Sequence, residues 1–209
     1  AVVTVVDDAS SKEVNNELLS GIPFACKDNY STAGILSTGS SNTLKDYVPF
    51  FTATAIKNLE SKGAVLVNKT AMDEFGMGGT GTTAHTGNIL NPWDKTRMCA
   101  GSSSGSAAIV AAGLIPYATG SDTGDSIRKP AAYCGIVGYK PTYGMISRYG
   151  LFAFASSVRL IAVVRAKLIF SSALSKELNT PFSKSVPSLL KFSVMLPLCS
   201  TAVLHFSST

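Results

Sequence analysis

The spacing of hydrophobic and polar residues predicts helices and strands that alternate along the chain. A helix is expected to follow Thr52, which can cap its start, and to end before Gly63. Its apolar face is formed by Ala53, Ile56 and Leu59. The next residues, AVLV at 64–67, are typical of a buried strand. A helix joined closely to a strand indicates an α/β fold.

Two turns of small residues each precede another predicted helix. Residues 101–105 read GSSSG and come before an Ala-rich run, 106–112, that favours a helix. Residues 120–126 read GSDTGDS, and a brief helix is expected from Ser126 up to Pro130. Such turns direct free backbone N–H groups at one point. The plainer alternative is that both turns are ordinary helix N-caps, for which Ser, Thr, Asp and Gly are the usual residues.

A lysine at the end of an upstream strand favours chemistry over capping. Residues 21–27 read GIPFACK, a short apolar strand that ends in Lys27. A lysine held in a low-dielectric environment can lose its proton and act as a base. Ser126 lies where successive backbone N–H groups can surround an oxyanion, as acyl transfer requires. The two residues are therefore a candidate base and a candidate nucleophile.

These turns resemble the core motif of the amidase signature enzymes. The motif appears here as AGSSSGS at 100–106 and GSDTGDSIRKPAAYCGIVGYKPT at 120–142, and the resemblance extends over residues 21–157. Three further segments resemble the branch of the family formed by the A subunits of bacterial glutamyl-tRNA(Gln) amidotransferases: KT at 69–70, MDEFGMG at 72–78 and PTYG at 141–144. The resemblance implies a mixed β-sheet covered by helices, incomplete in this chain.

The resemblance also implies a Ser-Ser-Lys triad that hydrolyses amides. Ser126 would be the nucleophile, Ser102 the bridging serine after a cis peptide bond, and Lys27 the neutral base. The remaining implied site residues are Thr123, Gly124 and Asp125, with Ser126, for the oxyanion, and Met77 and Gly78 for the substrate. Asp125 departs from the family pattern, which has glycine there, and brings a carboxylate next to a developing anion.

The same resemblance implies partners and a biological reaction. Ammonia released from glutamine, or from another small amide, would serve the transamidation of Glu-tRNA(Gln) together with B and C subunits. No cofactor or metal is expected in this chain, and ATP and Mg²⁺ are implied for the partner subunit. The alternative is an inactive, truncated remnant of such an amidase, which keeps the motif without a complete sheet.

Two other patterns in the sequence suggest different functions. GMGGTG at 76–81 satisfies the dinucleotide-binding spacing GxGxxG, which requires a strand before it and a helix after it. Here a short capped helix is expected at 70–75 and a loop at 82–91, so a nucleotide-binding module is disfavoured. His85 has no carboxylate or cysteine at metal-ligand spacing and is expected to be a loop histidine.

Composition and charge define the setting. At 209 residues and 45% hydrophobic, the chain is long enough for one domain with a sizeable core. Its net charge of +5 does not indicate a basic groove for tRNA, because residues 1–164 hold 13 Lys and Arg against 12 Asp and Glu. The cysteines are widely spaced and no signal peptide is apparent, which favours a reducing, cytoplasmic location.

The pattern changes near residue 165. We expect a partial amidase domain at 1–164 and an unrelated Ser-rich tail at 165–209 that is disordered or poorly packed. The departure from the family begins at Val158, and the tail contains no Gly and no Asp. Its apolar patches are too short to span a bilayer, so no membrane association is expected.

Overall fold

Helices and strands alternate in the order that an α/β protein requires. The computed structural model describes residues 1–7, 17–152 and, for the backbone alone, 160–165. The strands are β1 (Val2–Val5), β2 (Pro23–Lys27), β3 (Val65–Thr70), β4 (Tyr117–Asp122), β5 (Val137–Tyr139) and β6 (Leu160–Arg165). The helices are α1 (Thr54–Glu60), α2 (Ser104–Ala111) and α3 (Arg128–Tyr133), with single 3₁₀ turns at Asn42–Leu44 and Glu74–Gly76.

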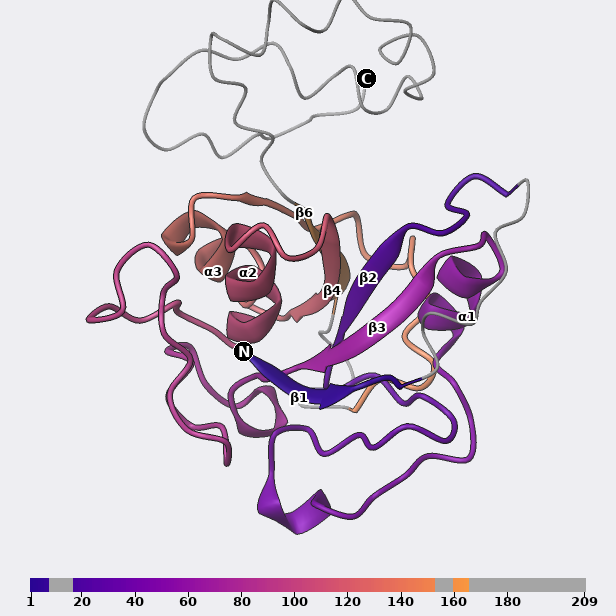
Figure 1. Ribbon diagram of the computed structural model, residues 1–209, viewed down its shortest axis with the longest axis horizontal. Coiled ribbons are helices and arrows are strands. Elements are labelled where there is room, and N and C mark those ends of the chain that lie inside the picture. Colours follow the sequence, from indigo (N-terminus) through magenta and orange to yellow (C-terminus); the bar gives the residue numbers. More distant parts are fainter. Residues whose placement is uncertain (8–16, 153–159, 166–209) are drawn as a thin grey trace, which may run out of the picture. The chain divides into compact units, whose positions relative to one another are not determined.

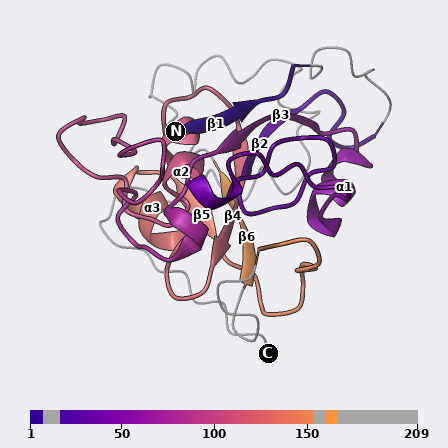
Figure 2. The same ribbon diagram turned by 90° about the horizontal axis from the view of Figure 1, so that it is seen from below.

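The strands form one mixed sheet in the order β1-β3-β2-β4-β6-β5. The central strand β2 pairs in parallel with both β3 and β4, whereas β1, β6 and β5 join by antiparallel pairing. The mixed sheet confirms the predicted fold class. Figure 1 shows α2 and α3 together beside β4 and α1 beside β3, and Figure 2 shows the same separation from below.

Alternation along β2 explains why both faces of the sheet carry a helix. Phe24 and Cys26 point to one side, into a cluster with Ile56 of α1. Ala25 points to the other side, into a cluster with Ile109 and with other residues of α2 and β4. Because both faces of β2 are buried, the run PFAC is apolar without a polar alternation. Lys27, two residues after Ala25, is therefore directed to the face that α2 covers.

Helix α2 packs unusually closely on the sheet. Its residues from Ser104 to Val110 are buried, and the Ser106 hydroxyl donates to the carbonyl oxygen of Thr119 at 2.8 Å. Gly105 allows this approach: its N–H donates to the carbonyl of Ala71 at 3.0 Å, and a Cβ at this position would overlap that same oxygen. The start of α2 is thus fixed against the end of β3.

Strand β6 was not predicted. Its backbone pairs with β4 from Asp122↔Leu160 to Tyr117↔Arg165, and with β5 on its other side. The sequence LIAVVR is a continuous apolar run followed by a charge, which is typical of a strand inside a sheet. The predicted tail at 165–209 lies outside the described residues apart from Arg165, so the domain boundary stays a prediction.

Several predicted element boundaries were wrong. Thr52 does not cap α1, because its hydroxyl oxygen accepts the N–H of Ala33 at 2.9 Å and the helix begins only at Thr54. Helix α3 begins at Arg128 and includes Pro130 in its first turn, where the missing N–H would have no intrahelical partner. The short helix expected at 70–75 is instead the last residue of β3 followed by the 3₁₀ turn at Glu74–Gly76.

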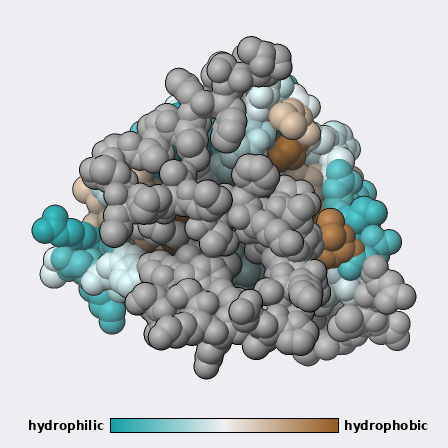
Figure 3. All heavy atoms as spheres, turned by 90° about the horizontal axis from the view of Figure 1, so that it is seen from above, coloured by the Kyte–Doolittle hydropathy of each residue, from teal (hydrophilic) through white to brown (hydrophobic). Residues whose placement is uncertain are grey.

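Part of the apolar surface remains exposed. Figure 3 shows brown, hydrophobic residues beside teal, hydrophilic ones on the coloured part of one face. Among the most exposed large apolar side chains of the described residues are Phe50, Leu114, Met145 and Tyr149. Tyr149 packs on Phe51, which in turn contacts Phe50 edge to face. No helix in the described part of the chain is both long and apolar enough to cross a membrane.

Candidate active site

Lys27 and Ser102 meet at the end of β2. The side-chain nitrogen Nζ of Lys27 lies 2.8 Å from Oγ of Ser102 and 2.9 Å from Oγ of Ser121. Lys27 is fully buried and Ser102 is 2% exposed. The Ser121 hydroxyl also accepts a hydrogen bond from the side-chain amide of Asn29 at 2.9 Å. The predicted base and the predicted bridging serine are thus in direct contact in a water-poor environment.

Ser102 lies just before α2, in an unusual backbone conformation. The peptide bond between Gly101 and Ser102 is cis, as the family resemblance predicts. The carbonyl oxygen of Ser102 accepts the N–H of Asp73 at 3.2 Å. The next residue, Ser103, donates its N–H to the carbonyl of Ser126 at 3.1 Å, so the first turn is tied directly to the second.

Asp122 fixes the shape of the second turn. It is the last residue of β4, it is fully buried, and its Oδ2 accepts the N–H of Ile127 at 3.0 Å. Arg128 and Lys140 pair with the same carboxylate at 3.2 and 3.1 Å. Burial alone would raise the pKa of Asp122, but the hydrogen bonds from Arg128, Ile127 and Lys140 outweigh it and hold the pKa below its usual range. The charged carboxylate therefore holds together the two ends of the turn between β4 and α3.

Four consecutive backbone N–H groups in this turn are available to a ligand. Within the described part of the chain, the amides of Thr123, Gly124, Asp125 and Ser126 donate to no protein acceptor. Thr123 and Ser126 are half-buried, whereas Gly124 and Asp125 are exposed to solvent. Successive backbone N–H groups in one turn are a common construction of an anion site. The arrangement fits the oxyanion role that the family resemblance implies for these residues.

A cavity brings nearly all the predicted site residues together. It has a volume of about 290 Å³ and is lined by Gly76, Met77, Gly78, Ser102, Ser121, Thr123, Gly124, Asp125 and Ser126. Lys27 lies behind Ser102 rather than in the lining. No hydrogen bond within the described residues joins the Ser126 hydroxyl to Ser102, a contact that in many enzymes forms only once substrate is bound. Sequence reasoning missed Gly76, Ser121 and Asn29 as neighbours of the site.

The charge that Asp125 introduces has a partner nearby. The ammonium group of Lys129 lies 3.7 Å from the Asp125 carboxylate, one helical turn further along the chain. Both side chains are partly exposed, so the attraction is screened by solvent. The pair nevertheless places a positive charge next to the carboxylate that departs from the family pattern.

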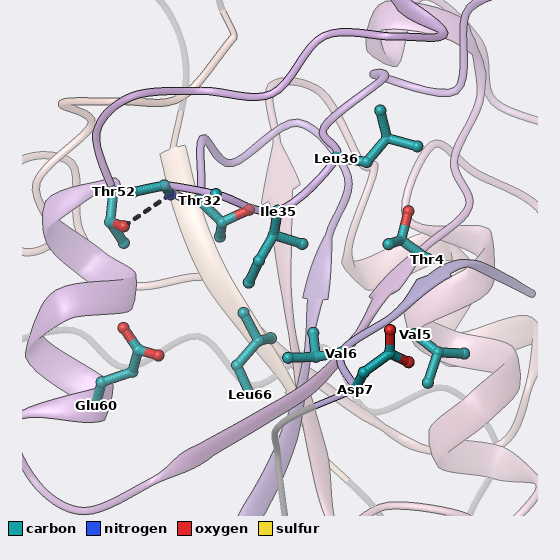
Figure 4. A pocket seen from close by; sticks show the side chains of 12 residues that line it. Thr4, Val5, Val6, Asp7, Thr32, Ile35, Leu36, Thr52, Glu60 and Leu66 are labelled. Carbon is teal, nitrogen blue, oxygen red and sulfur yellow. Dashed lines mark hydrogen bonds between the residues drawn. The ribbon is translucent and has the colours of Figure 1, made fainter.

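A larger cavity lies elsewhere and lacks this chemistry. It has a volume of about 600 Å³ and is shown in Figure 4, between β1, the loop at 32–36 and Leu66 of β3. Its lining consists of apolar and threonine side chains with the carboxylates of Asp7 and Glu60, and it includes no Ser, Cys, Lys or His. Volume alone therefore does not locate the candidate site.

The two competing patterns do not form sites in the described residues. The glycine-rich stretch 76–81 follows a 3₁₀ turn rather than a strand, and no helix follows it before residue 92. His85 is exposed in a loop, and its backbone N–H donates to the carbonyl of Ser40. No group of three His, Cys, Asp or Glu residues in the described part of the chain could hold a metal ion.

Comparison with known proteins identifies the family. The family model described as Amidase matches residues 5–176, and the chain belongs to this family. The A subunit of glutamyl-tRNA(Gln) amidotransferase from Streptococcus pneumoniae (strain 70585) is 52% identical over 176 residues, which cover 82% of this chain and 36% of that protein. The chain thus spans about a third of the length of this relative.

Solved structures agree with this placement. The crystal structure of the glutamyl-tRNA(Gln) amidotransferase A subunit from Thermotoga maritima matches with a TM-score of 0.72 and 45% identity, covering 79% of this chain and 36% of that one. The native peptide amidase from Stenotrophomonas maltophilia matches with a TM-score of 0.74 and 33% identity, covering 80% and 37%. The fold around the candidate site is therefore shared with amidases of different substrates.

Proposed function

We propose that this chain carries the amide-hydrolysing centre of a glutamine-dependent amidotransferase. The observation that carries the proposal is the contact of 2.8 Å between buried Lys27 and Ser102, with Ser102 lining the same cavity as Ser126. Among the described residues the cavity offers no histidine or cysteine, so a Ser-His or Cys-His mechanism has no base or nucleophile there. A serine nucleophile with a lysine base is the chemistry that the side chains support.

The proton path follows from the order of the side chains. The Ser126 hydroxyl attacks the amide carbonyl and passes its proton to Ser102, whose own proton moves to the neutral amine of Lys27. Protonated Lys27 then returns a proton through Ser102 to the leaving ammonia, and a water hydrolyses the acyl-enzyme by the same path. Ser121 and Asn29 orient Lys27 through the hydrogen bonds that converge on the Ser121 hydroxyl.

The oxyanion of each tetrahedral intermediate binds the unpaired amides of Thr123 to Ser126. Removing one such donor from an enzyme raises the activation barrier by about 3 to 4 kcal/mol. The donors contribute this stabilisation only when the turn holds them in position. Asp122 holds the turn through its hydrogen bond from the N–H of Ile127. Lys129 partly offsets the charge of the Asp125 carboxylate.

Glutamine is the amide that we propose as substrate, by similarity to the glutamyl-tRNA(Gln) amidotransferase A subunits. The ammonia would serve transamidation of Glu-tRNA(Gln) in a complex with other amidotransferase subunits, with ATP and Mg²⁺ acting at a partner subunit. The relatives are about three times as long as the matched segment, so the complex rather than the chain alone is proposed to perform the whole reaction.

A serine-directed probe tests the nucleophile. The chain is treated with a fluorophosphonate and analysed by peptide mass spectrometry, and ammonia release from glutamine is measured in parallel. We expect the adduct on Ser126 and its loss in Ser126→Ala, because Ser126 lies in the turn with the unpaired amides, whereas Ser102 and Ser121, the other serines of the cavity, contact Lys27. Ser147→Ala, an exposed serine outside the cavity, is the matched control and should label like the unchanged chain.

The outcomes separate the proposal from its alternative. Labelling that survives in Ser126→Ala would show that the nucleophile is wrongly assigned. Labelling of Ser126 without any release of ammonia from glutamine would support the nucleophile but contradict glutaminase activity of this chain, and would favour the inactive remnant.

A further inference from the structure

Asp73 contacts two segments that line the candidate active site, the loop of Met77 and Gly78 and the turn that carries Ser102. It follows β3 and the short stretch Ala71–Met72, and its side chain is fully buried. Its carboxylate accepts hydrogen bonds from backbone N–H groups of a single loop and from the hydroxyl of Thr83. The donors are the amides of Thr80, Gly81, Thr82 and Thr83, at 2.9 to 3.3 Å, with the Thr83 hydroxyl at 3.0 Å.

This loop is the continuation of the cavity wall. Met77 and Gly78 line the cavity, and the chain then turns back so that residues 80–83 surround the Asp73 carboxylate. A carboxylate that receives several amide hydrogen bonds in a buried position holds its loop strongly, because charge-assisted bonds are about twice as strong as neutral ones. Met77 is held at its start by the hydrogen bond from its N–H to the carbonyl of Glu74 at 2.9 Å, and the Asp73 carboxylate fixes the chain that follows Gly78.

Asp73 packs both against the loop that contains Gly78 and against the turn that contains Gly101 and Ser102. A Cβ on Gly78 would lie 2.5 Å from Cγ of Asp73, and a Cβ on Gly101 would overlap its Oδ2. The main-chain N–H of Asp73 donates to the carbonyl of Ser102 at 3.2 Å. The side chain thus sits between the substrate loop and the turn that carries the bridging serine, and both come close to it only because they present glycine.

We propose that Asp73 is a positioning residue that sets the substrate wall of the cavity relative to Ser102. The inference rests on the proposed amidase function and deepens it. The carboxylate acts on the loop of Met77 and Gly78, whereas Ser102 is held by the main chain of Asp73, which a side-chain substitution leaves in place. Loss of the carboxylate therefore weakens substrate binding more than the chemical step.

The test replaces Asp73 by Asn, which keeps the shape but directs an N–H₂ group at backbone donors. We expect KM for glutamine to rise at least about tenfold while kcat changes less than about threefold. Thr83→Ala removes one donor to the same carboxylate and should raise KM by a smaller factor. Asp94→Asn is the matched control: Asp94 accepts the N–H and hydroxyl of Thr96 at an exposed turn outside the cavity, and both constants should stay unchanged.

Hydrogen exchange provides a readout independent of activity. The amides of Gly81 and Thr82 should be protected in the unchanged chain and exchange at least about tenfold faster in Asp73→Asn, while amides of β2 keep their rates. A fall of kcat by about tenfold with KM unchanged would overturn the proposed role. Unchanged exchange rates of the Gly81 and Thr82 amides would also overturn it. If the unchanged chain hydrolyses no glutamine, the proposed function fails, and the exchange result alone decides whether Asp73 holds the loop.

Discussion

Replacing Asp122 by Asn tests whether a buried charge holds the turn that carries Ser126. The substitution keeps the size of the side chain and one carbonyl oxygen that can still accept the N–H of Ile127. It removes the negative charge that faces Arg128 at 3.2 Å and Lys140 at 3.1 Å. Two cations would then remain next to a neutral group in a largely buried position.

The magnitude follows from the exposure of the partners. Removing one member of a fully buried ion pair costs about 3 to 5 kcal/mol. The Arg128 side chain is 47% exposed and recovers part of its hydration, whereas Lys140 is 18% exposed and recovers little. We therefore expect the free energy of unfolding to fall by about 2 to 3 kcal/mol. With a urea m-value of about 2 kcal/mol/M, the midpoint of unfolding falls by about 1 to 1.5 M.

The assay is urea unfolding of the chain at neutral pH, followed by fluorescence of Trp93. Asp94→Asn is the control, because Asp94 pairs with Arg97 in an exposed turn where solvent screens the attraction, and its midpoint should not change. An unchanged midpoint for Asp122→Asn would refute the reasoning, since it would mean that neither cation depends on the carboxylate.

The pH dependence gives a second check with a fixed sign. The folded-state pKa of Asp122 lies below its unfolded value, which is about 3.9. Its stabilisation is therefore fully present above the unfolded pKa and is lost as the pH falls through the folded pKa. The difference in midpoint between the unchanged chain and Asp122→Asn should be widest at neutral pH and should narrow below about pH 4. A constant difference down to about pH 2 would contradict a depressed pKa.

Two further substitutions test the packing around the site. Gly105→Ala should destabilise the chain by about 1 to 3 kcal/mol, because its Cβ would overlap the carbonyl oxygen of Ala71, and a urea midpoint above that of the unchanged chain would contradict the close contact of α2. Lys69→Met should lower the free energy of unfolding by about 3 to 5 kcal/mol, because it leaves the fully buried Asp28, which lies 3.6 Å from the Lys69 ammonium, without its counter-charge. Lys62→Met is the control at an exposed ion pair and should leave the urea midpoint near its original value.

Local signals were sufficient for the elements that carry the candidate residues Lys27 and Ser102. The strand that ends in Lys27 is a short apolar run between Gly21 and a polar segment, and α2 is an Ala-rich run that follows a turn and precedes Gly113. Both remained where the pattern placed them, although α2 begins at Ser104 rather than Ser106. Both elements are buried, so their tertiary contacts favour the same strand or helix that the local sequence favours.

The misses share a different cause, which is competition from distant residues. Thr52 has the chemistry of a helix cap, but a loop some twenty residues earlier uses its hydroxyl. Asp73 could have been interpreted as a cap of the following turn, yet its carboxylate binds residues 80–83 instead. Ser121 was assigned to a turn, whereas it is in β4 and reaches Lys27. A single sequence shows which groups can accept a hydrogen bond but not which donor the fold will bring.

The place of the site follows from strand direction. Strands β2 and β4 are parallel neighbours, so their carboxyl ends meet at one edge of the sheet, where Lys27 and Asp122 are the last residues. Helix α2 begins at the same edge because the connection from β3 to β4 crosses one face of the sheet and must start beyond the end of β3. The face is chosen by the pleat: a slip of one residue in β2 would turn Lys27 from Ser102 toward the cluster of Phe24 and Ile56. The stacking of Phe24 on Tyr117 of β4, with ring centroids 5.7 Å apart, opposes that slip and so keeps Lys27 on the same side of the sheet as Ser102.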